Sequence, residues 1–174
     1  MTNTSTLADM PTGLASQRAN ALAERLEQGA RALITFASNL TDAEWHTRVP
    51  HDGRTVGVTV HHVASVYPVE IELAQVIARG EAITNVTSRD IDDMNARHAA
   101  EHSTITRAMA LELLEQNSAV AATAIRAFTD GQLATAMPVS LYANAPLTCQ
   151  FFLEDHAVRH SYHHLARLRR ALRP

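Results

Sequence analysis

Four histidines lie close together near the end of the chain, and their spacing is suited to chemistry with a metal ion. They are His156, His160, His163 and His164. On a helix, residues four apart such as His160 and His164 lie one above the other, with Cβ atoms about 5–6 Å apart. Two imidazoles in that arrangement can reach one divalent ion. The same spacing is also common in pairs of surface histidines that bind nothing.

The side of the helix on which each histidine lies distinguishes the four. At about 100° per residue, His160 and His164 fall within an apolar arc, whereas His156 and His163 lie about 40–60° outside it. The arc is formed by Leu153, Ala157, Val158, Leu165, Leu168, Ala171 and Leu172. We therefore expect His160 and His164 to face the core. The pair His156 and His160 has the same spacing and is the alternative.

A third histidine for such a site lies in an earlier helical segment. His62 falls in a mostly apolar row, whereas His61 falls on a more polar side; the row contains Val58, Thr59, Ser65, Val66, Val69, Leu73 and Val76. Taken alone, His62 is best interpreted as a hydrogen-bonded core histidine. Beside the inward pair it becomes the natural third ligand, and three nitrogen ligands with an open position are typical of catalytic zinc. Zinc is therefore the expected ion, although imidazole also suits nickel, copper and iron.

A metal-binding histidine usually donates its second ring nitrogen to a carboxylate, a carbonyl or water. Glu70, Glu154 and Asp155 are the nearest acidic candidates in the sequence, and the sequence does not rank them. A bound divalent ion could lower the pKa of a water to about 7 or activate a thiolate.

Four long segments have helical periodicity and would position these histidines. Apolar residues recur every three or four positions over residues 17–39, 55–79, 104–128 and 149–172. Thr41 and Glu44 form a capping-box pattern that predicts a short helix carrying Trp45, and Pro68 is expected to kink the second long helix or remove a hydrogen bond. The pattern predicts an all-α antiparallel four-helix bundle. We expect a single domain of residues 14–174 after a disordered lead of residues 1–13.

The connecting segments are less regular. The pattern predicts a charged helix over residues 88–101, either separate from the next helix or continuous with it. We expect His98 and His102 to lie on its solvated face. Residues 138–146 read as a loop, and Thr148 is a plausible cap for the last helix. No segment indicates a strand.

Composition excludes several classes of function. The chain has 174 residues and a formal net charge of −3, so there is no electrostatic reason to expect nucleic acid or an anionic membrane as a partner. All 15 basic residues are arginine, which excludes a Schiff-base or P-loop lysine. The sequence contains neither a glycine-rich dinucleotide loop nor a G-x-S-x-G elbow.

Two single residues narrow the chemistry further. The only cysteine, Cys149, cannot form an internal disulfide and is interpreted as a small buried filler. Ser161 stands where a His-Glu-x-x-His protease needs its glutamate, which argues against that activity.

There is no signal peptide pattern and no apolar run of membrane-spanning length. We expect a soluble, cytoplasmic protein.

Four short motifs, in this order and spacing, resemble the DinB-like family. They are Asp42–Trp45, Thr55–Gly57, His61–Ala64 and His160–Arg169. This is the DNA-damage-inducible, YfiT-like group, which is related to mycothiol-dependent maleylpyruvate isomerases. The resemblance implies a four-helix bundle, often dimeric, with a metal site at His62, His160 and His164. In some members it also implies thiol-dependent transferase or isomerase chemistry.

The chain departs from the family pattern at two positions. Arg54 replaces a tryptophan that commonly precedes the Thr-Val-Gly segment, and Arg167 replaces a glutamine that follows the second helical histidine. Both are expected near the mouth of the pocket, where Arg54, Arg159 or Arg167 could hold a carboxylate of the thiol or substrate.

Two hypotheses of different kinds follow from the sequence. The first is a metal-dependent enzyme, either a transferase or isomerase that uses a small thiol such as mycothiol or bacillithiol, or a hydrolase, acting on a small molecule as a homodimer. The second is a non-catalytic metal-binding or stress-related interaction bundle. The metal content of protein purified without a histidine tag would discriminate between them.

Overall fold

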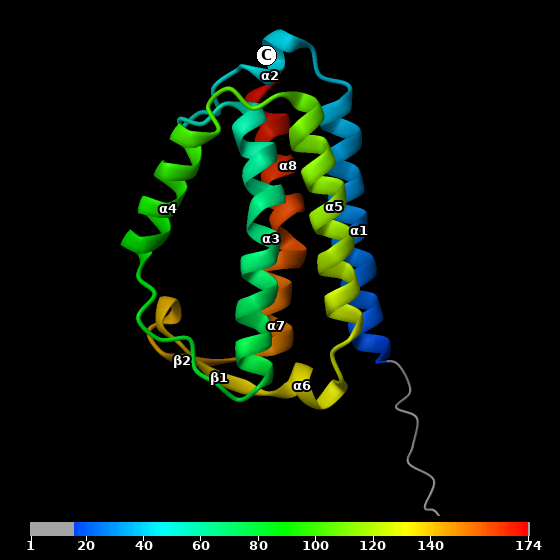
Figure 1. Cartoon of the computed structure of the whole chain (residues 1–174), viewed down its shortest axis with the longest axis vertical. Helices are drawn as coiled ribbons and strands as arrows, with labels where there is room; N and C mark the ends of the chain where they lie inside the picture. Colours follow the sequence, from blue (N-terminus) through cyan, green and yellow to red (C-terminus); the bar gives the residue numbers. More distant parts are fainter. Residues whose placement is uncertain (1–15, 174) are drawn as a thin grey trace, which may run out of the picture.

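Four long helices pack side by side and run in two directions (Figure 1). In this computed structural model, which describes residues 16–173, they are α1 (Gln17–Ser38), α3 (Val56–Ala78), α5 (Arg107–Arg126) and a final helix of three parts, α7 (Cys149–Leu153), η2 (Glu154–Val158) and α8 (Arg159–Ala171). The predicted all-α four-helix bundle is confirmed. The expected disordered lead, residues 1–13, lies outside the described residues.

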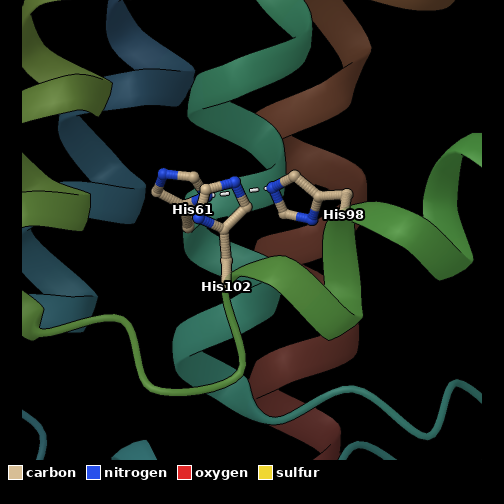
Figure 2. A group of neighbouring side chains, drawn as sticks. All are labelled: His61, His98 and His102. Carbon is tan, nitrogen blue, oxygen red and sulfur yellow. Dashed lines mark hydrogen bonds between the residues drawn. The ribbon is translucent and has the colours of Figure 1, made fainter.

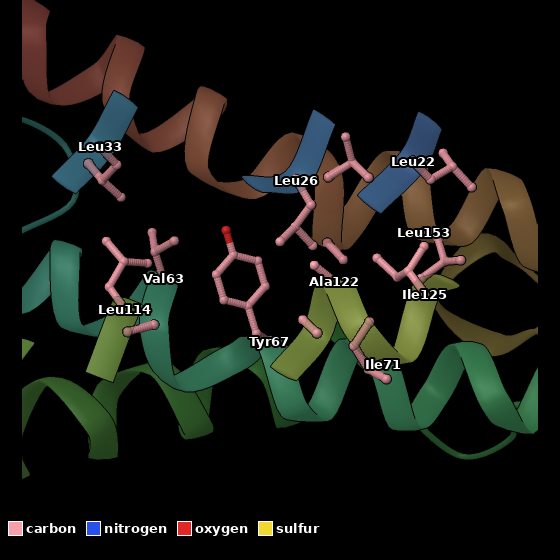
Figure 3. Close-up of a cluster of buried hydrophobic side chains, with 14 of the residues drawn as sticks. Leu22, Leu26, Leu33, Val63, Tyr67, Ile71, Leu114, Ala122, Ile125 and Leu153 are labelled. Carbon is pink, nitrogen blue, oxygen red and sulfur yellow. The ribbon is translucent and has the colours of Figure 1, made fainter. Parts of the chain in front are cut away.

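The core lies between the four long helices and contains one apolar row from each (Figure 3). Fully burying each large aliphatic side chain contributes about 1.5–3 kcal/mol to folding. The largest contributors include Leu26 and Leu33 of α1, Val63 and Tyr67 of α3, Leu114 and Ile125 of α5, and Leu153 of α7.

The row of α3 that the helical periodicity predicts to face inward is not this core row. Val66 and Leu73 are only half-buried, and Val69 is 43% exposed. The core row contains Val63 and Tyr67 instead. The helix is apolar around most of its circumference, so the periodicity of α3 alone does not identify the side that meets the core.

Helix α4 (Ser88–Glu101) is a crossover that stands outside the bundle and brings the chain back to the end where α3 begins (Figure 1). As a result α3 and α5 run in the same direction, opposite to α1 and the final helix. Two contacts fix this end: Trp45 Nε1 donates to the Ile105 carbonyl at 3.2 Å, and Arg107 pairs with Asp42 at 3.0 Å. A turn separates α4 from α5, so the two are not one continuous helix.

The first turn of α3 is shaped by a tryptophan lying on a glycine. Helix α2 (Asp42–Trp45) begins with the expected capping box between Thr41 and Glu44. A Cβ added to Gly57 would come within 2.4 Å of the Trp45 ring. Only glycine therefore lets α2 pack against α3 in this way, which gives a physical reason for two of the sequence motifs.

Pro68 lies inside α3 and removes one helical hydrogen bond, as expected, because it lacks the N–H that would reach the Ala64 carbonyl. Asn117 of α5 replaces that donor, with its Nδ2 2.9 Å from the Ala64 oxygen. The bundle therefore satisfies the carbonyl that the proline leaves free.

The segment between α5 and the final helix contains a small hairpin, so the expectation of a loop without strands is wrong. After α6 (Asp130–Ala134), β1 (Ala136–Val139) pairs antiparallel with β2 (Ala145–Thr148) across the short η1 (Ser140–Tyr142). Each strand has four residues and contains a proline, so neither shows the alternation that would reveal it. Thr148 caps α7 as expected.

No helix in residues 16–173 combines the length and the apolar character needed to cross a membrane.

Candidate metal centre

Three histidines converge between α3 and α8, and we call His62, His160 and His164 the first cluster. One ring nitrogen from each lies within 4.8 Å of the others. The Nε2 atoms of His62 and His160 are 3.3 Å apart. Two nitrogens bound to one tetrahedral zinc at about 2.0–2.1 Å would be about 3.3–3.4 Å apart. The structure thus brings together the three histidines that the sequence analysis selected, at a spacing that suits one ion.

Burial favours the neutral form of two histidines of the first cluster, His62 and His164. It lowers the pKa of His62 to about 2, with a further contribution from the nearby Arg54 charge. Burial also lowers the pKa of His164 strongly, and the neighbouring His160 adds a smaller effect in the same direction. Neutral imidazoles offer lone pairs to a metal. Within the described part of the chain, the buried Nδ1 of His164 has no hydrogen-bond partner, so this donor set fits a cation.

Glu70 on α3 supports the first cluster. The Nδ1 of His160 donates to Glu70 Oε1 at 2.6 Å, which fixes the tautomer and leaves Nε2 free to face His62. Of the three acidic candidates in the sequence, Glu70 is the one in contact with a histidine of the cluster. Glu154 and Asp155 instead bind residues outside it.

A pocket of about 170 Å³ opens beside the first cluster, with His62 and His160 in its wall. Most of its other lining is apolar and comes from α3, the segment between α3 and α4, α4 itself, the hairpin and the final helix: Val66, Val69, Leu73, Ile83, Val86, Ile91, Met94, Val139, Leu141 and Phe152. The half-buried row of α3 therefore faces this pocket rather than the core.

His156 also lines the pocket, although the helical periodicity predicts it to lie outside the apolar arc. Its ring stacks on Phe152 with centroids 4.3 Å apart, and its Nε2 lies 3.0 Å from the Tyr142 hydroxyl. Hydrogen bonding of the π type in η2 makes a wider turn, so angles computed for a regular helix do not carry across it. As expected, His156 is not in the first cluster, and His163 is exposed.

The three arginines proposed as substrate contacts are already paired. Asp52 binds both Arg54 (Nη2 to Oδ2, 2.9 Å) and Arg167 (Nη2 to Oδ2, 3.1 Å). Burial opposes ionisation of Asp52, but the hydrogen bond and charge of Arg54 outweigh it and hold the pKa of that carboxyl below its usual range. Arg159 is exposed and pairs with Asp155. Among described residues, Nη1 of Arg54 is buried without a partner.

Cys149 is a buried filler rather than a nucleophile. Its thiol lies against the Ala74 carbonyl, with Sγ 3.4 Å from the oxygen. Burial raises the pKa of this thiol to about 11. Ser161 is also buried and shares a hydrogen bond with Tyr67 in the core, so position 161 points away from the first cluster.

A second group of histidines was missed by the sequence analysis. His61, His98 and His102, which we call the second cluster, have ring nitrogens within 4.8 Å of one another (Figure 2). The expectation that His98 and His102 lie on a solvated face is wrong, because both are half-buried against α3. Their i, i+4 spacing, which matches that of His160 and His164, was the available signal.

A helical bundle with a buried three-histidine cluster beside an apolar pocket defines the class of protein. Residues 25–168 match the DinB superfamily, and the chain belongs to that superfamily. This confirms the resemblance found in the sequence.

Two solved structures share the fold. YfiT from Bacillus subtilis, described as a probable metal-dependent hydrolase with an unusual four-helix bundle topology, is 19% identical with a TM-score of 0.69, over 94% of this chain and 90% of that one. The mycothiol-dependent maleylpyruvate isomerase is 17% identical with a TM-score of 0.66, over 95% of this chain and 63% of that one. No curated protein sequence matches the chain.

Proposed function

We propose that this protein is a divalent-metal-dependent enzyme in which His62, His160 and His164 hold the ion, with zinc as the favoured metal and nickel as the alternative. The observation that carries the proposal is the convergence of three imidazoles beside an apolar pocket. The Glu70 carboxylate on His160 adds the supporting contact that metal-binding histidines usually have.

The pocket supports a small, largely apolar substrate. A divalent metal held at the first cluster would act as a Lewis acid and lower the pKa of a water or thiol. Most of the side chains that line the pocket beside that position are apolar. His156 reaches the same pocket, and burial lowers its pKa, so at neutral pH it is able to accept a proton from a substrate.

Arg54 is the most suitable of the three arginines to hold a carboxylate of the substrate. Its Nη1 is buried without a partner among described residues, and its charge acts on His62. Arg167 pairs with the same Asp52 but has no buried nitrogen without a partner among the described residues, and Arg159 is exposed, so both are less suitable.

The finer proposal is a thiol-dependent transferase or isomerase. Cys149 is buried with a raised pKa, so a reactive thiol would have to be a small molecule such as mycothiol or bacillithiol. The shared fold with a mycothiol-dependent isomerase favours this choice, and the shared fold with a probable hydrolase favours hydrolysis as the alternative. The homodimer stays a prediction.

The test is metal analysis of protein purified without a histidine tag, before and after His160→Ala. We expect the variant to lose one equivalent of metal, and the matched control His163→Ala to keep it. Turnover of candidate esters and thiol adducts, with and without added thiol, then separates hydrolase from transferase. Metal retained without any turnover would favour the non-catalytic bundle, and equal metal in both variants would overturn the ligand assignment.

A further inference from the structure

The second cluster has the geometry of a ligand set rather than of a chance contact. His61 Nδ1 and His98 Nε2 are 2.9 Å apart, and the His102 ring centroid lies 4.1 Å from that of His61 and 4.7 Å from that of His98. His61 comes from α3, and His98 and His102 come from the end of α4, so the rings join two helices (Figure 2).

The cluster also lacks the partners that three histidines would otherwise need. Nδ1 of His98 is buried with no hydrogen-bond partner in residues 16–173. Within the same residues, no ion pair or hydrogen bond joins any of the three rings to a carboxylate. A histidine cluster held by charge would need one.

From this arrangement we propose that His61, His98 and His102 form a second metal-binding site, for zinc or a similar transition-metal dication, that fastens α4 to α3. Nitrogen ligands alone favour such ions over magnesium or calcium. The site is separate from the first cluster in its residues, because the neighbouring His61 and His62 project to different groups. The two clusters nevertheless adjoin, with the His62 and His98 ring centroids 5.5 Å apart.

Fastening α4 matters for the pocket. In α4 no residue is fully buried, so the helix has little apolar packing of its own to hold it in place. It nonetheless supplies Ile91, Met94 and Asn95 to the wall of the pocket beside the first cluster. A metal at the second cluster would therefore stabilise the closed wall of the pocket without taking part in the reaction.

The test is a zinc titration of chelator-stripped protein, with bound zinc counted after dialysis. We expect two equivalents in the unmodified chain, one in His98→Ala/His102→Ala, and one in His160→Ala/His164→Ala. The control His46→Ala/His163→Ala removes two exposed histidines that belong to neither cluster and should keep two. His98→Gln/His102→Gln, which keeps side-chain bulk, guards against loss by misfolding and should also bind one.

Amide hydrogen exchange gives a structural measurement beside the count of bound zinc. Zinc should slow amide hydrogen exchange in α4 of the unmodified chain and leave α4 of His98→Gln/His102→Gln unchanged. One equivalent in the unmodified chain, lost only with His160→Ala/His164→Ala, would overturn the second site while the proposed function stands. Two equivalents in both the alanine and the glutamine variants of the second cluster would overturn it as well.

Discussion

The two histidine clusters have the same composition but differ in what holds them. Each takes one histidine from α3 and an i, i+4 pair from another helix. In the first cluster that other helix is α8, which buries Leu165 and Leu168 in the core. In the second the pair lies at the end of α4, with His98 in its last turn and His102 as its C-cap, and no residue of α4 is fully buried. The first cluster is therefore positioned by the fold itself, whereas the second depends on its own contacts to stay assembled.

This difference separates two ways of building a site. Core packing holds the first cluster near one geometry before any ion arrives, which limits the entropy lost on binding. The second cluster can come apart when α4 moves, so an ion there would have to order the helix as it binds. The same three ligands should therefore bind less tightly in the second cluster than in the first.

The largest expected effect concerns α3, the helix that both clusters share, and should weaken both clusters together. Gly57→Ala would place a Cβ 2.4 Å from the Trp45 ring at the start of α3, the helix that both clusters share. Overpacking of this kind costs about 1–3 kcal/mol, or more where the ring cannot move. Denaturant unfolding should show the loss, and zinc binding should weaken at both sites.

Gly131→Ala is the matched control, because a Cβ there meets only Thr129 at 3.9 Å. It should leave the free energy of unfolding unchanged or slightly raised. Equal stability of the two alanine variants would show that the tryptophan does not fix α3.

A more selective change should weaken the first cluster alone. Glu70→Gln removes the carboxylate that accepts the hydrogen bond from His160 Nδ1, and loss of such a partner typically costs about 10–100-fold in metal affinity. Competition with a fluorescent chelator would measure it. Glu72→Gln, an exposed neighbour on the same helix, is the control. A loss at the second cluster instead would show that the clusters do not act separately.

The same contrast explains which features of the fold and of the site could be predicted from the sequence. His160 and His164 were placed correctly because their helix has an apolar arc that only the core can satisfy. His98 and His102 were misplaced because α4 has no such arc: its position follows from the direction of the crossover, a tertiary property. His156 was misjudged for a local reason, since the π-type turn of η2 leaves no mark in the periodicity. Capping residues such as Thr41 and Thr148 were predictable because their hydrogen bonds are local.

A smaller effect is expected where α5 supports α3 at Ala64, which follows His61 and His62 in that helix. Asn117→Ala leaves the Ala64 carbonyl without the donor that replaces the missing N–H of Pro68. We expect a loss of about 1 kcal/mol in the free energy of unfolding, as for one hydrogen bond. Gln116→Ala, at an exposed position beside it, should have little effect. A metal affinity reduced at one cluster only would show that Asn117 positions that cluster.

The smallest effect concerns how firmly the metal-free second cluster holds α4. Burial lowers the pKa of His61 and His98 to about 4, and the ordinary value near 6.5 returns when α4 moves away. Between those two values the open state binds protons that the closed state does not, so the closed state loses stability as pH falls from about 6.5 towards 4. The neighbouring His102 and Arg54 charges act in the same direction.

Amide exchange of metal-free protein, corrected for the intrinsic effect of pH, measures this opening. Protection of α4 should fall relative to α5 as pH drops from 7 to 4.5, because α5 is held by core residues such as Leu114 and Ile125. His98→Gln removes one titrating group and should flatten the dependence. If α4 kept the same relative protection across this range, the two lowered pKa values would not be linked to its attachment.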